Sequence, residues 1–213
     1  MEEGLRRAAF LEQGVRRTRG AQVALLQRLL LAPSVGSSVA PARARSVVVC
    51  GTHLRASADD AFRLRQAAEV VSALADFSRG DEQIVLADVN SHAPSDADLG
   101  GAPSSVFEYF LACGYRCAYR SVGQARANAN ASVGAGAVPG GSAFPTYTTW
   151  AGWASGDFRS VCDHIFVSGG LHVEAVLDVP PAERLGEAYP ERLPNAAFPS
   201  DHMSLVADLV LAS

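Results

Sequence analysis

The chain has 213 residues, 48% of them hydrophobic and 19% charged, which is typical of a globular protein and argues against a disordered or fibrous one. Its formal net charge of -4 argues against binding nucleic acid through bulk electrostatic attraction. An acidic site that cleaves a phosphodiester is still compatible with this charge, because the carboxylates that bind Mg²⁺ make such a site negative.

The first half of the chain is expected to contain short buried strands, an irregular stretch and a helix. Residues 1–20 are expected to form a poorly defined amino-terminal segment. Apolar runs predict buried strands at 21–26 and 46–50, and the Pro-, Gly- and Ser-rich stretch 29–45 between them predicts a loop. From 59 to 77 the apolar positions fall near one helical face and a glycine follows, so a helix is expected there.

The second half continues the alternation. A strand is expected at 83–87, followed by a helix over "SSVFEYFLACG", which a serine caps and Gly114 ends. The stretch 121–143 is low in complexity and almost lacks large apolar groups, so it predicts a flexible surface loop. Further strands are expected at 161–167, 171–178 and 204–211. Strands interleaved with two helices indicate an α/β or α+β layered domain over residues 21–213.

We expect no signal for secretion or for membrane insertion in the chain. Its first residues, "MEEGLRRAAFLEQ", begin with acids and lack the apolar core of a secretory signal. No apolar run approaches the roughly 18 residues of a membrane helix. The four cysteines lack the CxxC pair or nearby histidine of a zinc site and are expected to be reduced thiols. We therefore expect a cytoplasmic protein that does not contact a membrane, with the mitochondrion and the nucleus as alternatives.

The polar residues able to handle protons or metals share one placement, since each follows, interrupts or precedes a predicted strand. They are His53 in "GTHL", Asp88 and Asn90 in "DVNS", Asp163 in "CDHIF", and Asp201 and His202 in "SDH". At strand ends, side chains from distant parts of the chain converge while a rigid sheet fixes their positions. The joint pattern therefore predicts one catalytic or metal-binding site.

Taken singly, these residues have simpler structural explanations. Asp88 and Asn90 could begin a turn, His53 could be a histidine of the core, and Asp201 could be a turn acid. Asp163 is harder to explain, because a carboxylate inside an apolar strand must either face water or find a polar partner. Both alternatives for Asp163 stay open at this point.

The ordered set of short motifs resembles the endonuclease/exonuclease/phosphatase family, and within it the deadenylase branch. The motifs are "GTHL", "RLRQ" with Arg63 and Gln66, "VLADVNS", "TYTT", "FRSVCDHIFVS" and "LPNAAFPSDHMSL". They extend from about residue 20 to residue 211. The resemblance implies an α+β fold, namely the carboxyl-terminal half of the family's four-layer sandwich.

For function, the resemblance implies a Mg²⁺-dependent phosphodiesterase, with Mn²⁺ as an alternative ion. Its activity would be that of a 3′-exoribonuclease that removes poly(A) from an RNA 3′ end in mRNA decay. Two alternatives stay open. One is a non-catalytic module that binds RNA or protein. The other is a 2′-phosphatase or 2′,5′-oligoadenylate phosphodiesterase of the same fold, with a nucleotide as its substrate.

The resemblance also implies a role for each residue. Asp88 would orient or deprotonate the attacking water, and Asn90 would lie beside the phosphate. His202 would contact the scissile phosphate, and Asp163 would hydrogen-bond His202, fixing its tautomer and favouring its charged form. The remaining roles are metal ligation by Asp88 and Asp201, a second phosphate contact by His53, and base stacking by Phe158, which could equally be an aromatic of the core.

The chain also departs from the family pattern. The family's amino-terminal half is missing, and with it the Glu that is the principal Mg²⁺ ligand. We therefore expect the chain to be inactive by itself and to need a longer gene product or a partner chain that supplies this half. Motif positions differ as well, among them Gly51 in place of Asn, Ala87 in place of Gly, Val89 in place of Phe and His164 in place of Tyr.

Overall fold

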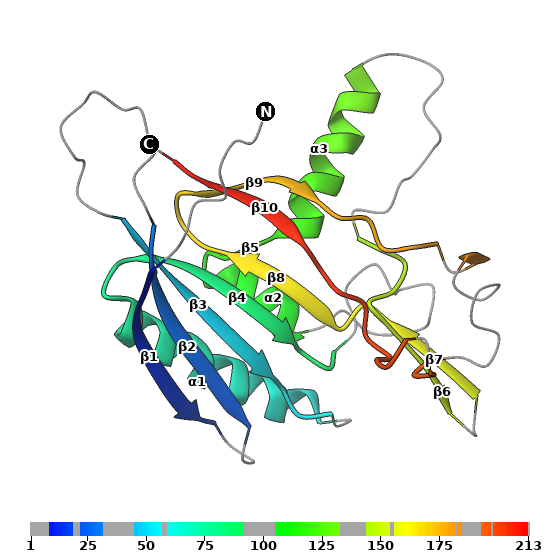
Figure 1. Cartoon of the computed structure of the whole chain (residues 1–213), viewed down its shortest axis with the longest axis horizontal. Helices are drawn as coiled ribbons and strands as arrows, with labels where there is room; N and C mark the ends of the chain where they lie inside the picture. The colour runs from blue at the N-terminus through cyan, green and yellow to red at the C-terminus, as the bar shows by residue number, and fades with distance from the viewer. Residues whose placement is uncertain are drawn as a thin grey trace.

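A six-stranded sheet forms the centre of the structure, a computed structural model that describes residues 9–18, 22–31, 45–56, 59–91, 105–132, 144–153, 156–181, 183–184, 193–196 and 198–212. The strand order is β1–β2–β3–β4–β8–β5 (Figure 1). In that order the strands are β1 (Ala9–Arg17), β2 (Val23–Leu30), β3 (Ser46–His53), β4 (Glu82–Asp88), β8 (Asp163–Val167) and β5 (Arg116–Cys117).

The sheet is mixed, and its one parallel pair lies next to the residues of interest. β1, β2 and β3 pair antiparallel, β3 and β4 pair parallel, and β8 lies antiparallel between β4 and β5. Parallel neighbours need a crossover connection, and here it is helix α1 (Asp60–Ser78). As a result β3 and β4 end at the same edge of the sheet, where the antiparallel β8 begins.

Two helices cover one face of this sheet (Figure 1). α1 begins after Asp59, whose carboxylate accepts a hydrogen bond from the backbone N–H of Phe62, and it ends at the left-handed Arg79. α2 (Ser105–Ala112) buries Phe107 and Phe110 against the same core. No helix in the described part of the chain is long and apolar enough to cross a membrane.

The remaining elements form two small additions. β9 (Leu171–Val176) pairs antiparallel with β10 (Ala207–Leu211), and helix α3 (Ala118–Ser132) contacts both β8 and β9. β6 (Thr149–Trp153) and β7 (Gly156–Ser160) make an antiparallel ribbon. Figure 1 shows this ribbon beyond the end of the sheet at which β4 ends and β8 begins.

Helix α3 corrects the predicted loop at 121–143, because residues 121–132 are helical. The first turns of α3 are anchored by the buried Ala118, Tyr119 and Val122. The Ala, Arg, Asn and Gln residues that follow can form a helix, but they show no apolar stripe. The hydrophobic pattern of the sequence therefore gives no sign of this helix. Residues 133–143 lie outside the described residues.

Strand β1 corrects the prediction of a poorly defined segment at 1–20, since Ala9–Arg17 pair along almost their whole length with β2. β1 is an edge strand, where charged residues such as Glu12 and Arg16 are tolerated and blur the apolar alternation. β2 continues to Leu30, so the predicted loop at 29–45 begins too early. The short strands β5, β6 and β7 were also not predicted.

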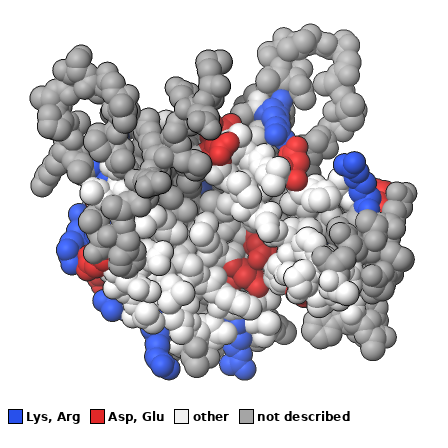
Figure 2. All heavy atoms as spheres, in the orientation of Figure 1, with Lys and Arg blue, Asp and Glu red and all other residues white. Residues whose placement is uncertain are grey.

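The sheet face opposite α1 is only partly covered. Residues in register across the strands form one row on it, which we call the open row: Val15, Leu25, Gly51, Leu86 and Ile165. Val15, Leu25 and Leu86 are 52%, 49% and 44% exposed, and a side chain at Gly51 would meet no atom within 4 Å. In Figure 2, seen from the same side, uncharged surface surrounds a small group of acidic residues. This face therefore leaves apolar groups in contact with solvent.

Candidate active site

Three strands place His53, Asp88 and Asp163 side by side. His53 is the register partner of Asp88 in the parallel β3–β4 pair, and Asp88 is the register partner of Asp163 in the antiparallel β4–β8 pair. Register partners point to the same side of a sheet. These residues therefore form a second row, two positions along from the open row and on the same face.

The carboxyl-terminal segment adds His202 to this row. An isolated bridge pairs His202 with Thr149, and the backbone N–H of Met203 donates to the carbonyl of Thr148 over 2.7 Å. The N–H of Trp150 donates to the carbonyl of Asp201 over 2.8 Å. The "SDH" motif is therefore held by backbone bonds to the "TYTT" motif, which explains how a loop residue can be fixed opposite a strand.

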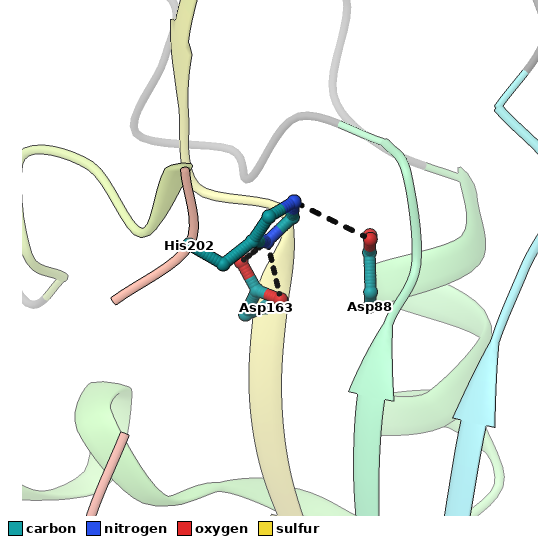
Figure 3. Close-up of side chains that lie close together, drawn as sticks. All are labelled: Asp88, Asp163 and His202. Carbon is teal, nitrogen blue, oxygen red and sulfur yellow. Dashed lines mark hydrogen bonds and ion pairs between the residues drawn. The ribbon is translucent and has the colours of Figure 1, made fainter. Parts of the chain in front are cut away.

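Asp163 and His202 form a hydrogen-bonded pair, as the family resemblance implies (Figure 3). His202 Nδ1 lies 2.9 Å from one carboxylate oxygen of Asp163 and 3.1 Å from the other, while Nε2 lies 3.9 Å from Oδ2 of Asp88. The hydrogen bond to Asp163 raises the pKa of His202 to about 9, although burial opposes the shift. His202 is therefore an imidazolium at neutral pH, with an N–H at both ring positions.

Asp88 lies between the two histidines and is largely buried. Burial, followed by repulsion from the Asp163 carboxylate, raises the pKa of Asp88, although the Asn90 N–H and the two histidines act in the opposite direction. Two neighbouring carboxylates in a partly buried place stabilise a cation between or beside them. The donor set thus has the chemistry expected of a divalent-metal site.

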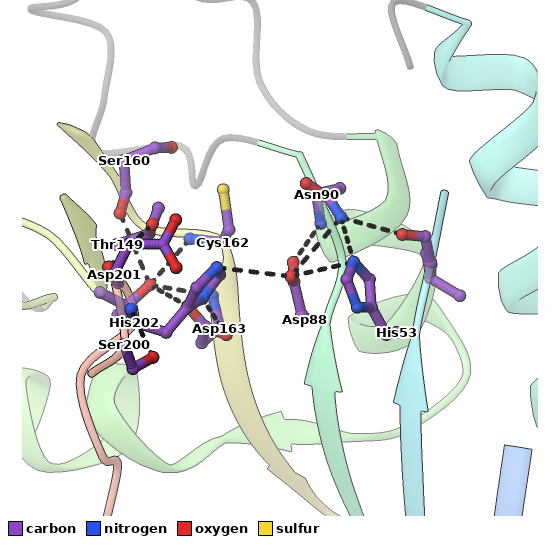
Figure 4. A network of polar contacts seen from close by, with 12 residues as sticks. His53, Asp88, Asn90, Thr149, Ser160, Cys162, Asp163, Ser200, Asp201 and His202 are labelled. Carbon is purple, nitrogen blue, oxygen red and sulfur yellow. Dashed lines mark hydrogen bonds and ion pairs between the residues drawn. The ribbon is translucent and has the colours of Figure 1, made fainter. Parts of the chain in front are cut away.

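Asn90 holds the edge of the site through a turn (Figure 4). Its backbone is left-handed, with φ of 48°, a conformation that asparagine tolerates better than most residues. Its N–H donates to Oδ1 of Asp88 over 2.8 Å, and its side-chain amide donates to the carbonyl of Leu54 over 2.9 Å. The same amide nitrogen lies 2.8 Å from Nε2 of His53, which is itself 3.3 Å from Oδ2 of Asp88.

The group of possible metal ligands differs from the predicted one. Within the described residues, Asp88, Asp163 and His202 offer ligand atoms that all lie within 4.8 Å of one another. Asp201 was predicted as a ligand but is not part of this group. Its carbonyl accepts the Thr149 hydroxyl, and its charge contributes to the raised pKa of His202. Asp201 is therefore a neighbour of the group.

Thr148 is a site residue that the sequence pattern does not single out. It is fully buried, and its hydroxyl donates to Oδ2 of Asp163 over 2.7 Å. The Thr148 hydroxyl oxygen in turn accepts hydrogen bonds from the backbone N–H groups of Cys162 and Asp163, at 2.9 and 3.0 Å. Thr148 thus fixes the carboxylate that orients His202. The "TYTT" motif was the available signal, but a motif alone does not say which threonine faces the carboxylate.

Phe158 stands apart from this cluster. It lies on β7 in register with Ala151 of β6, and it is 42% exposed, so it is not an aromatic of the core. The site thus unites His53, Asp88, Asn90, Asp163 and His202, with Asp201 adjacent and Phe158 on the separate ribbon.

Comparison with known proteins finds a family that matches most of the chain. The sequence model of the Endonuclease/Exonuclease/phosphatase family matches residues 9–202. Mouse nocturnin is 30% identical over 168 residues, which cover 77% of this chain and 33% of the mouse protein. Human nocturnin is 44% identical over 69 residues, or 32% of this chain and 15% of the human protein. The chain thus spans about a third of the length of mouse nocturnin.

Solved structures show the same fold. The human Nocturnin catalytic domain with bound sulfate superposes with a TM-score of 0.63 and 23% identity, covering 97% of this chain and 61% of that one. An endonuclease/exonuclease/phosphatase from Bacteroides vulgatus gives a TM-score of 0.60 and 16% identity, over 96% of this chain and 66% of that one. The predicted α+β fold is therefore confirmed.

Proposed function

The chain belongs to the endonuclease/exonuclease/phosphatase family of hydrolases, in its nocturnin-like branch, and we propose that it acts as a Mg²⁺-dependent phosphodiesterase. The observation that carries the proposal is the row of His53, Asp88 and Asp163, closed by His202. It places two histidine rings and two partly buried carboxylates within a few ångströms of one another. These are the groups that phosphodiester hydrolysis requires.

Asp88 would hold the metal ion, with Asp201 as the second ligand that the family resemblance implies. Both oxygens of Asp163 contact His202 Nδ1, and one also accepts the Thr148 hydroxyl, so this carboxylate is already engaged. Oxygen ligands suit Mg²⁺, and Mn²⁺ is an acceptable substitute. A bound ion would neutralise phosphate charge and act as a Lewis acid.

The side chains divide the remaining chemistry. His202 directs Nδ1–H to Asp163, so its Nε2–H is available to donate to a phosphate oxygen and to stabilise charge that develops on phosphorus. Asp88 lies within 4 Å of this nitrogen and would orient the attacking water and accept its proton. The Asn90 amide and the exposed His53 would position the phosphate at the other side of Asp88.

We propose a poly(A) 3′ end as the substrate, which makes the protein a 3′-exoribonuclease in mRNA decay. Phe158, which is exposed on the β6–β7 ribbon, supports this choice, because an exposed aromatic ring can stack on a base. Two other activities use the same residues: hydrolysis of 2′,5′-oligoadenylate and removal of a 2′-phosphate from a dinucleotide. A non-catalytic RNA- or protein-binding module is the fourth candidate.

The open row supports a further part of the proposal, namely that a second sheet covers this face in the active protein. The open row lies next to the row of His53, Asp88 and Asp163. Residues of both rows help to line a hollow of about 240 Å³, whose lining includes Leu86, Asp88, Asp163, Ile165, Met203 and Leu205. We propose that a longer gene product or a partner chain supplies this sheet together with an acidic metal ligand. The chain by itself would then have little or no activity.

The four free cysteines of the chain support a cytoplasmic location, because thiols stay reduced in that compartment. Fractionation of cells that express the protein tests this part of the proposal. Recovery in the mitochondrial or nuclear fraction would contradict it.

The test of function is an assay of the chain, and of any longer product of its gene, on oligo(A), 2′,5′-oligoadenylate and NADPH. In the form that carries the covering sheet we expect Mg²⁺-dependent release of AMP from oligo(A), abolished by EDTA and by Asp88→Asn or His202→Ala. The chain by itself should release little or none. Asp208→Asn, which changes an exposed acid on β10, is the matched control and keeps the activity. Turnover of only one of the other substrates would reassign the activity. Tight RNA binding without turnover in any form would leave the binding module as the function.

A paired test addresses the open row. Replacing Leu25 and Leu86 together by Glu puts charge on this face, whereas Leu177→Glu changes an apolar residue that is 60% exposed elsewhere. We expect both variants to stay folded. Only the Leu25 and Leu86 double variant should lose activity, or lose association of the chain with the covering sheet. Unchanged activity and unchanged hydrodynamic size in the double variant would show that the face is not an interface.

A further inference from the structure

We propose that Asp60 is a positioning residue that holds Asn90 in place through Ser91. The proposal rests on the proposed function, since it assigns Asn90 to the phosphate side of the site. Asp60 itself lies in the first turn of α1, and its hydrogen bonds go to Ser91, Arg63 and Ser105. It acts on them through the segment that follows β4.

The Asp60 carboxylate joins three parts of the chain. Oδ1 accepts the hydroxyl of Ser91 over 3.2 Å and the guanidinium of Arg63 over 2.9 Å. Oδ2 accepts the hydroxyl of Ser105, the first residue of α2. One carboxylate thus fixes the residue after Asn90 to the amino-terminal ends of both helices.

Asn90 needs such an anchor because its backbone is left-handed. A residue in this region costs free energy unless the surrounding structure determines it. Before Asn90, the turn is held by the bond from its N–H to Asp88. After Asn90, the hydroxyl of the buried Ser91 is bonded to Asp60. With both ends held, the amide of Asn90 reaches Leu54 and His53.

Arg63 makes the anchor rigid. Its side chain is only 8% exposed, whereas that of Asp60 is 39% exposed, so water screens this ion pair only from the Asp60 side. Burial raises the pKa of Asp60, but the hydrogen bonds from Ser105 and Arg63 outweigh this effect and the pKa is lowered. Asp60 is therefore a carboxylate acceptor at neutral pH, able to accept all three donors at once.

A simpler role for Asp60 is to stabilise α1 as an acid in its first turn. Asp59 offers the matched control, because its carboxylate caps the same helix through the N–H of Phe62. Loss of either acid weakens the start of α1. Only loss of Asp60 releases Ser91 and Ser105.

The test compares Asp60→Ala and Asp60→Asn with Asp59→Ala in the full chain. By amide hydrogen exchange, we expect the Asn90 N–H to exchange about 10-fold faster in Asp60→Ala, with amides of the central strand β3 unchanged. In whichever form of the protein is active, kcat should fall about 10-fold or more with little change in KM, as for partners that orient catalytic groups. Asp60→Asn keeps an acceptor oxygen, so its Asn90 exchange rate and its kcat should lie between those of Asp60→Ala and wild type. Asp59→Ala should leave both the exchange rate and kcat close to wild type.

Two outcomes would overturn the proposal. Exchange at Asn90 that is unchanged in Asp60→Ala would show that Ser91 does not need this anchor. Equal effects of Asp59→Ala and Asp60→Ala on Asn90 would reduce Asp60 to a helix-stabilising acid. Because hydrogen exchange needs no turnover, these results do not depend on the proposed activity. Absence of catalysis in every form would instead contradict the proposed function.

Discussion

His202 donates a hydrogen bond from Nδ1 to Asp163, and this bond turns Nε2 towards Asp88, 3.9 Å away. One carboxylate thus orients the imidazole, and the other faces the nitrogen that remains. The two acids come from neighbouring strands and are register partners, so their spacing is set by the backbone of the sheet. Their different partners give them different tasks.

Replacing Asp163 by Asn should lower the pKa of His202 from about 9 towards its ordinary value of 6.5, because the hydrogen bond to the carboxylate is the main cause of the shift. NMR titration of the His202 ring in metal-free protein measures it, and Asp208→Asn should leave the pKa unchanged. The raised pKa also predicts that the pair stabilises the fold fully below about pH 6.5 and that this contribution is lost as the pH rises through about 9. Urea unfolding should show the difference between wild type and Asp163→Asn shrinking over that interval.

His164 should make the protein sensitive to mild acid. Its ring is surrounded by Phe107, Phe144 and Phe166, its Nε2 has no hydrogen-bond partner among the described residues, and burial lowers its pKa to about 4. Between pH 6.5 and 4 the unfolded chain binds a proton that the folded chain does not, so stability falls as the pH falls. His164→Leu should reduce the loss of urea stability between pH 7.5 and 5.

The matched control for that change is His172→Leu, since His172 is exposed on β9. It should leave the pH dependence of unfolding as in wild type. A His164→Leu variant whose stability falls with pH as steeply as that of wild type would show that other groups cause the acid sensitivity.

Thr148→Val should impair the site more than its small change in volume suggests. It leaves the N–H groups of Cys162 and Asp163 without their acceptor and removes a donor to the Asp163 carboxylate. We expect kcat to fall about 10- to 100-fold, as for partners that orient metal-site residues. Thr148→Ser keeps the hydroxyl and should retain most of the activity. Equal kinetics of the Val and Ser variants would rule out this role.

Arg28 should contribute more to stability than any surface ion pair. It is 9% exposed, donates to the carbonyls of Phe77 and Ser78 at the end of α1, and pairs with Glu12 and Asp81. Arg28→Met removes these contacts, although Glu12 keeps its pair with Arg79 and Asp81 its bond from the Ser46 hydroxyl. The loss should cost about 2 kcal/mol in urea unfolding, the scale of hydrogen bonds that involve a charged group.

The comparison for Arg28 is the exposed pair of Arg126 and Asp178. Arg126→Met should change the free energy of unfolding by less than about 1 kcal/mol, because water screens this pair. Similar losses in the two variants would mean that the Arg28 cluster stabilises no more than surface charges do.

The strands and helices with strong apolar patterns could be predicted from the sequence. The helix expected at 59–77 is α1, and the strands expected at 46–50 and 83–87 are β3 and β4, each with boundaries shifted by a few residues. β1 and α3 could not be predicted, because neither segment shows a regular spacing of apolar residues. β1 is defined by its pairing with β2, and α3 by three buried residues in its first turns.

The convergence of the site could be predicted, but its internal connections could not. Placement at strand ends indicated that His53, Asp88 and Asp163 meet, and the resemblance to the family added the bond between Asp163 and His202. The part played by Thr148 depends on which side chain of the "TYTT" segment points at Asp163, which a motif does not encode. The contact of Asp60 with Ser91 joins residues 31 positions apart and carries no sequence signal.

Because His53, Asp88 and Asp163 are neighbours only through strand register, the site depends on the phase of each strand. One residue inserted within β4 before Asp88 would turn this side chain to the helix-covered face, although composition and hydrophobicity would hardly change. Two inserted residues would return it to the correct face but displace it by about 7 Å along the strand. Relatives that tolerate long insertions in their loops should therefore have β3, β4 and β8 segments of unvarying length next to the site.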